Sequence, residues 1–246
     1  MPFMRSSNPV LRSVESSRTF EGVEAASYTG ITMKTLLLLG LAVLSGFFVI
    51  SQMLGSNIES VIPLLIPAMI IALVSVLVAS FVPRLAMPFS MAYALATGVN
   101  LGFITLIVEV FVPGAAIMAV IGTATVFTVM LFLYTSRTIR VTSMFRRIMI
   151  SSLFSILIMF VIFTILNMTT DIFLAANPTI AIGISAFLII FGGLMLTLDF
   201  DRAEAIVESG ADKRYEWIVA MGLMITLVWI YYEILRLVLI LASRRN

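Results

Sequence analysis

The sequence contains no cysteine and no histidine among its 246 residues. The lack of cysteine excludes disulfides and thiolate nucleophiles, and the lack of histidine excludes imidazole metal ligands and histidine-based acid–base catalysis. Carboxylates are then the side chains that titrate closest to neutral pH. The sequence also has no recognisable phosphate-binding loop, catalytic triad or metalloprotease helix. We therefore expect a protein that is not an enzyme and that needs no cofactor.

Charged residues are scarce as well. They make up 11% of the chain, whereas soluble globular proteins contain about 25%. Hydrophobic residues make up 61%, and the mean hydropathy is +1.15. This composition is typical of a polytopic membrane protein, whose first partner is the lipid bilayer. The net charge of +2 does not point to nucleic acid, because basic residues in membrane proteins commonly mark cytoplasmic loops.

Seven apolar stretches are each close to the length of about 20 residues that a helix needs to cross a hydrocarbon core. They cover residues 34–54, 61–83, 88–111, 115–135, 147–167, 179–200 and 217–241. Because lipid offers no hydrogen-bond partner to open backbone groups, these spans must be helices. The sequence therefore predicts an all-α polytopic membrane helical bundle over 34–246. A polar cytoplasmic tail over 1–33, without the apolar core of a cleavable signal peptide, precedes it.

The predicted connections differ in charge from one side to the other. Twelve basic residues lie in the tail, at the edge of the first span and in the second-to-third, fourth-to-fifth and sixth-to-seventh connections: Arg5, Arg12, Arg18, Lys34, Arg84, Arg137, Arg140, Arg146, Arg147, Arg202, Lys213 and Arg214. The alternate connections, near 55–60, 112–114 and 168–178, hold none. The positive-inside rule then places the N-terminus in the cytoplasm and, with seven spans, the C-terminus outside. Arg244 and Arg245 favour the alternative that the last segment is re-entrant.

Small residues on the third span predict close helix packing. Gly98 and Gly102 form a GxxxG element, which lets a neighbouring helix approach. Asn100, between them, can donate a hydrogen bond across that contact. We expect a packing role for this element rather than a ligand site.

Ionisable groups within or at the edge of the spans are costly unless each has a partner, an aqueous cavity or a route to the interface. Glu109, near the outer end of its span, can snorkel to that interface. Glu233 and Arg236 are three residues apart on one helical face, so they can form a pair that orients the last span. Position alone favours Asp199, followed by Asp201, as the start of a solvated acidic loop.

A functional alternative is that Asp199 and Glu233 face each other across a water-filled path. Two nearby carboxylates cannot both ionise cheaply, so one keeps a proton near neutral pH. Such a pair is both a pH sensor and a cation site, and its oxygen ligands suit Ca²⁺. Because 16 residues of helix, about 24 Å, separate Trp217 from Glu233, direct contact requires a late start, a tilt or a bend in the last span, or a deeper end to the sixth.

Several segments together resemble the Bax-inhibitor-like superfamily, the transmembrane Bax inhibitor motif proteins, and in particular its bacterial YccA-like branch. The resemblance runs along almost the whole chain. Its most specific pieces are MRSSNPV at 4–10, TGIT at 29–32, LFLY at 131–134, RVT at 140–142, LDFD at 198–201, YEW at 215–217 and WIYYEILRL at 229–237.

The resemblance implies six helices around a central seventh, and a pH-dependent calcium leak controlled by an acidic pair on the last two helices. Carried over, that pair is Asp199 and Glu233, which would also be transient calcium ligands. The residues assigned to the pH sensor and ion path are Asp199, Asp201, Glu109, Glu233 and Arg236, and Arg84 is the nearest candidate for a basic latch. The chain departs from the characterised leak proteins, which usually have Asp in place of Glu233 and a shorter spacing than the 34 residues found here. Thr97-Gly98 stands where many relatives have Glu-Gly.

Our leading hypothesis is thus a pH-sensitive calcium leak channel of the bacterial plasma membrane, with calcium as the permeant ion. The main alternative is a non-conducting membrane regulator that binds another integral protein, such as a membrane-anchored protease. An intramembrane enzyme is a third class, for which the chain offers no catalytic motif.

Overall fold

The computed structural model describes residues 25–55, 58–169 and 178–244. Its helices are α2 (Tyr28–Leu54), α3 (Ile58–Phe81), the short 3₁₀ helix η1 (Pro83–Leu85), α4 (Ala86–Phe111), α5 (Ala115–Thr135), α6 (Ser143–Thr169), α7 (Pro178–Glu208) and α8 (Tyr215–Ser243). Within these ranges, seven helices are long and apolar enough to cross a membrane. The prediction of an all-α polytopic bundle is confirmed.

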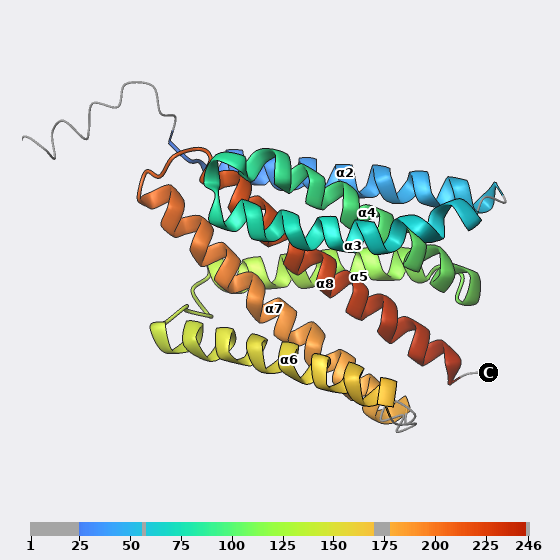
Figure 1. The fold of residues 1–246 in the computed structure, drawn as a ribbon. Coiled ribbons are helices and arrows are strands. Elements are labelled where there is room, and N and C mark those ends of the chain that lie inside the picture. The colour runs from blue at the N-terminus through green and yellow to red at the C-terminus, as the bar shows by residue number, and fades with distance from the viewer. Residues whose placement is uncertain (1–24, 56–57, 170–177, 245–246) are drawn as a thin grey trace, which may run out of the picture.

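Helix α8 is the centre of the bundle. It packs against α2, α4, α5 and α7, and α6 lies beside α7. Figure 1 shows α8 between the group α2 to α5 and the pair α6 and α7. Its buried residues are Glu216, Val219, Ala220, Met221, Leu223, Met224, Thr226, Leu227, Val228, Ile230 and Leu235. The central seventh helix that the resemblance implies is therefore present.

The seven helices alternate in direction, so α2, α4, α6 and α8 all begin at one end of the bundle, the left end in Figure 1. We call it the basic end, because the predicted basic connections lie there. A segment before α2 is fixed at this end: the amide of Ala26 donates to the carbonyl of Ala211 at 2.8 Å, and Ala25 bridges to Asp212. Residues 1–24 of the predicted tail lie outside the described part of the chain.

Two helix boundaries differ from the predicted ones by more than four residues. Helix α2 begins at Tyr28, six residues before the predicted span, because the side chain of Ser27 caps it by accepting from the amide of Gly30. Helix α7 continues to Glu208 rather than ending at residue 200. Helix α8 is one unbroken helix of 29 residues, which is long enough to span fully, so the re-entrant alternative for the last segment is wrong.

The predicted GxxxG packing is confirmed, and the neighbouring helix is α2. A Cβ atom added at Gly98 would overlap the backbone of Ala42 and the hydroxyl of Ser45, and one added at Gly102 would overlap the backbone of Gly46. At Gly102 the backbones of α2 and α4 thus touch directly, and at Gly98 the small Ser45 side chain fits between them. Asn100 does not bond across this contact, because its amide donates to the carbonyl of Ala96 in its own helix at 3.2 Å.

The substitution Gly98→Ala should destabilise the bundle by about 1–3 kcal/mol, because backbone atoms of α2 would have to move. The matched control is Gly40→Ala, since no atom lies within 4 Å of a Cβ at Gly40. Thermal unfolding of both variants in detergent measures the difference. If both variants unfold at the same midpoint temperature, the close contact between α2 and α4 does not contribute to stability.

Candidate functional site

Asp199 is buried inside α7 rather than exposed in a loop. It lies nine residues before the end of the helix and is 8% exposed. Its Oδ2 accepts a hydrogen bond of 2.6 Å from the hydroxyl of Thr226 on α8. The interpretation of Asp199 as the start of a solvated loop is therefore wrong. The acidic residues after Asp199, which suggested a loop, lie on about two further turns of α7.

A cavity of about 360 Å³ opens beside this carboxylate. Its charged lining residues are Asp199, Asp201, Arg146 and Arg202, and Thr226 adds a hydroxyl. Asp201 forms an ion pair with Arg146 of α6 at 2.5 Å, and both side chains are partly exposed. On the opposite wall, a Cβ added at Gly222 would lie 3.7 Å from Oδ1 of Asp199. This is an ordinary van der Waals distance, so Gly222 lies directly beside the carboxylate. The cavity connects the buried Asp199 with the partly exposed side chains of Asp201 and Arg146.

Glu233 lies on the same pair of helices, at a different depth. Its Oε2 atom is 3.8 Å from Nη1 of Arg236, which is the predicted pair three residues apart. The facing residue on α7 is Ser185, which is fully buried. Neither the Ser185 hydroxyl nor Glu233 Oε2 has a hydrogen-bond partner among the described residues. This contact is thus polar but incompletely satisfied, which is a costly arrangement in a buried place.

The structure does not bring Asp199 and Glu233 together. The partner of Asp199 on α8 is Thr226, and the seven residues from there to Glu233 correspond to about 10 Å of helix. Apolar packing fills this interval: the rings of Phe191 and Trp229 are 5.9 Å apart, and Ile230 is fully buried. The two acids therefore lie one after the other along the interface of α7 and α8. They do not form a shared calcium ligand set.

Glu109 has a structural role that we did not predict. Its carboxylate accepts hydrogen bonds from the amides of Gly114 at 2.6 Å and Ala116 at 2.9 Å. These amides belong to the turn after α4 and to the first turn of α5, where no helical carbonyl is available. Gly114 adopts a positive φ of 87° there, which favours glycine. Glu109 thus caps α5, and its charge is satisfied by this turn.

Arg84 is exposed in η1. Among the described residues it forms an ion pair with neither Asp199 nor Glu233, so the proposed latch contact is not made in this structure. In the same part of the chain, no cluster of three or more acidic, histidine or cysteine residues is arranged to hold a metal ion.

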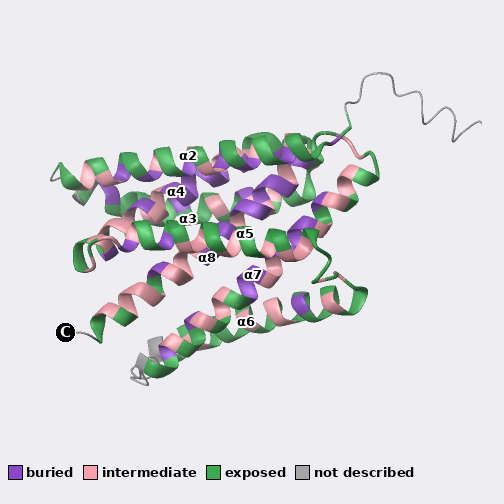
Figure 2. Ribbon diagram, turned by 180° about the vertical axis from the view of Figure 1, so that it is seen from behind, coloured by how far each residue is buried: buried purple, intermediate pink, exposed green. Residues whose placement is uncertain are grey.

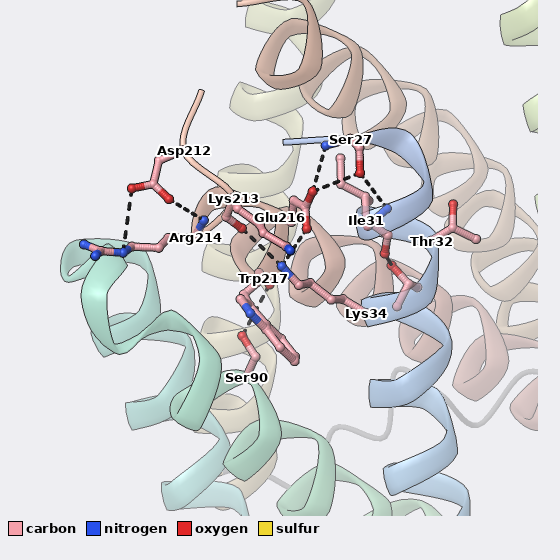
Figure 3. A network of polar contacts seen from close by, with 12 residues as sticks. Ser27, Ile31, Thr32, Lys34, Ser90, Asp212, Lys213, Arg214, Glu216 and Trp217 are labelled. Atoms are coloured by element: carbon pink, nitrogen blue, oxygen red, sulfur yellow. Dashed lines mark hydrogen bonds and ion pairs between the residues drawn. The ribbon is translucent and has the colours of Figure 1, made fainter. Parts of the chain in front are cut away.

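A second buried carboxylate, at the basic end, escaped the sequence analysis. Glu216 of α8 has a fully buried side chain and forms an ion pair of 2.6 Å with Lys34 of α2. Its other oxygen accepts from the amide of Ser27 at 2.7 Å. Figure 3 shows these groups converging, with the Lys34 ammonium also 4.9 Å from the ring centre of Trp217. The network fixes the beginning of α2 to the beginning of α8.

The sequence carried a partial signal for this network. The positive charge of Lys34 marks topology, but it also interrupts an otherwise apolar span, where a charge needs a partner. Glu216 stands beside Trp217 at the start of the last span, where a buried charge needs a partner. Lys34 and Glu216 are 182 positions apart in the sequence. No local spacing pattern could therefore indicate that they form a pair.

A family model described as Bax inhibitor 1 like matches residues 8–243. The chain belongs to the Bax inhibitor 1 like family. Comparisons with curated proteins and with solved structures give no match. The family match covers every described helix, so the acidic residues on α7 and α8 all lie within the Bax inhibitor 1 like region.

The network around Glu216 gives a test of how this Bax inhibitor 1 like bundle is held together. The substitution Lys34→Met should destabilise it by about 3–5 kcal/mol, because it leaves a buried carboxylate without its cation. Adding Glu216→Gln to Lys34→Met should recover much of that loss. Thermal unfolding of the single and double variants measures both effects. A double variant less stable than Lys34→Met alone would contradict the pairing.

The capping role of Glu109 gives a separate test. Glu109→Ala removes the acceptor for two amides and should cost about 1–2 kcal/mol of stability. The control is Glu59→Ala, since Glu59 is an exposed acid on α3. Chemical unfolding in detergent compares the two. The capping role is excluded if Glu109→Ala unfolds no more easily than the control.

Proposed function

We propose that the protein is a pH-sensitive calcium leak channel in which Asp199 is the proton-sensitive residue. The observation that supports this most is the place of Asp199: a buried carboxylate in contact with α8, beside a cavity that it shares with Asp201. An ionisable residue inside a membrane span costs more free energy than an apolar residue at the same place, so it is by default a candidate for a functional role.

The ion path that we propose follows the interface of α7 and α8. Asp199 stands toward its basic end and Glu233 farther along, so a cation would meet the two carboxylates in series. Phe191, Trp229 and Ile230 close the interval between them. This apolar packing is the closed gate in our proposal. Calcium passing between the acids would keep part of its water shell, because each carboxylate offers ligands from one side only.

The gate responds to pH through the contact between Asp199 and Thr226. A hydroxyl that donates to a carboxylate makes a charge-assisted hydrogen bond, which is stronger than the same bond to a neutral acid. Adding a proton to Asp199 weakens this link between α7 and α8 and shifts the balance between closed and open arrangements. The partner of Asp199 is thus an uncharged hydroxyl, in place of the second carboxylate that we predicted.

Calcium flux into liposomes that contain the purified protein, measured across roughly pH 5 to 8, tests this function. We expect wild-type flux to vary with pH. Asp199→Asn should reduce the ratio of fluxes at the two extremes to about 1, because the titrating group is gone. Thr226→Val should change the flux in the same direction as Asp199→Asn, since both remove the charge-assisted contact.

Two control variants keep the result specific. Glu208→Gln removes an exposed acid from the end of the same helix and should leave the pH profile unchanged. Thr125→Val removes a hydroxyl that bonds only within its own helix and should do the same. A pH profile in Asp199→Asn that matches the wild type, with both proteins folded, would contradict the mechanism.

A second function has one observation in its favour. Helix α6 is apolar, yet Met149 is the only buried residue among its described side chains. Figure 2 shows this helix in the colours of exposed and intermediate residues along most of its length. Such a face suits either lipid or another integral protein, as a non-conducting regulator requires. Folded protein that conducts no calcium at any pH would favour this alternative.

A further inference from the structure

A deep apolar cleft lies on the far side of α8 from Asp199. Helices α2 and α5 each pack against α8, but they do not pack closely against each other. A cavity of about 610 Å³ occupies the space between them, within the range of about 300–1,000 Å³ that is usual for small-molecule sites. Residues of α2, α4, α5 and α8 form its walls.

The cleft is long, narrow and open on one side. Along α2 its lining runs from Thr32 to Ile50, about 27 Å of helix, which is close to the thickness of a hydrocarbon core of about 30 Å. Floor residues such as Leu227 are buried, whereas the rim residues Val43 and Val120 are 70% and 58% exposed. In a spanning segment such a rim faces lipid, so the cleft is continuous with the lipid-facing surface of the bundle.

The polar atoms in the lining are already satisfied. The hydroxyls of Thr35 and Thr123 donate to carbonyls of their own helices at 2.9 and 2.7 Å. Those of Thr105 and Tyr231 bond to each other at 2.9 Å. No charged residue lines the cleft. A polar ligand or a chain of water would therefore find few partners there, whereas hydrocarbon needs none.

We propose that this cleft binds an acyl chain of a membrane phospholipid, which enters from the bilayer between α2 and α5 and fills the part of the cleft that lies in its own leaflet, about 15 Å. The acyl chain makes van der Waals contacts with lining residues that would have no partner atoms if the cavity were empty. It touches protein on three sides, whereas a chain against a convex helix surface touches it on one. Burial from water does not favour it over bulk lipid, so the preference rests on these additional packing contacts.

The site would place lipid directly behind the helix that carries the contact with Asp199. Leu223, Leu227 and Tyr231 of α8 line the cleft, whereas Gly222 and Thr226 face the cavity beside Asp199. Ile225 also lines the cavity beside Asp199, and Val228 also lines the cleft. With these two included, at about 100° per residue the centres of the two sets lie nearly opposite each other around α8. Occupancy of the cleft therefore limits how far α8 can move away from α7. The binding site itself does not depend on calcium conduction.

Photolabelling tests the site directly. The full-length protein is placed in phosphatidylcholine nanodiscs that contain a trace of phosphatidylcholine with a diazirine on one acyl chain, and adducts are mapped by mass spectrometry. We expect adducts on floor residues such as Leu227, which only a chain inside the cleft can reach. Labelling of the rim should exceed that of the exposed α6 residue Val161 by roughly threefold, because the chain is held on three sides.

Blocking variants complete the experiment. Ala124 is an exposed residue of the lining, and Ala124→Phe should reduce adducts on Leu227 by roughly threefold or more by filling the cleft. Val43→Phe, on the opposite wall, should have the same effect and serves if the first variant is unstable. Val161→Phe is the control and should leave floor labelling unchanged. Floor residues without adducts, or floor labelling that persists in both folded blocking variants, would overturn the proposal.

Discussion

The fold depends on keeping α8 at the centre of the bundle although it carries polar groups. Lipid cannot satisfy those groups, so they depend on partners within the protein, and two of the contacts reach neighbouring helices. Glu216 finds Lys34 and Ser27 on the side of α2, and Thr226 finds Asp199 on α7. These contacts fix the register of α8 against both neighbours. The surrounding apolar side chains then pack against α8, whose position along the bundle axis is fixed by these polar contacts.

The two sides of α8 differ in character, and this difference organises the functional proposals. Toward α7, the interface holds carboxylates, a hydroxyl contact and a cavity lined by charged residues. Toward α2 and α5, it borders an apolar cleft in which every lining hydroxyl that we described has a partner. In our two proposals, α8 responds to protons through the polar contact on one face and to lipid in the cleft on the other. The packing of α2 on α4 through Gly98 and Gly102 gives this arrangement a rigid outer wall.

Sequence reasoning located the seven spans because hydropathy is a property of each segment alone, and it found the GxxxG contact because glycine spacing is local. It failed where a contact joins distant segments. The charges after Asp199 suggested a loop, but they lie on two more turns of α7. Thr226 carries no charge and gave no signal as the partner of Asp199. Glu109 was read as a snorkelling acid because its role depends on the turn at Gly114, and the pair of Lys34 and Glu216 spans most of the chain.

In the proposed mechanism, the contact between Asp199 and Thr226 holds α7 against α8 in a proton-dependent way. Because the chain has no cysteine, two spin labels can be introduced without background, at Ala205→Cys on α7 and Met33→Cys on α2, which are both exposed. The distance distribution between them, measured by pulsed electron paramagnetic resonance in nanodiscs, reports the position of α7 relative to the rest of the bundle. We expect a distribution that changes between high and low pH and that becomes independent of pH when Asp199→Asn is added. Identical distributions at both pH values in the protein that retains Asp199 would contradict this mechanism.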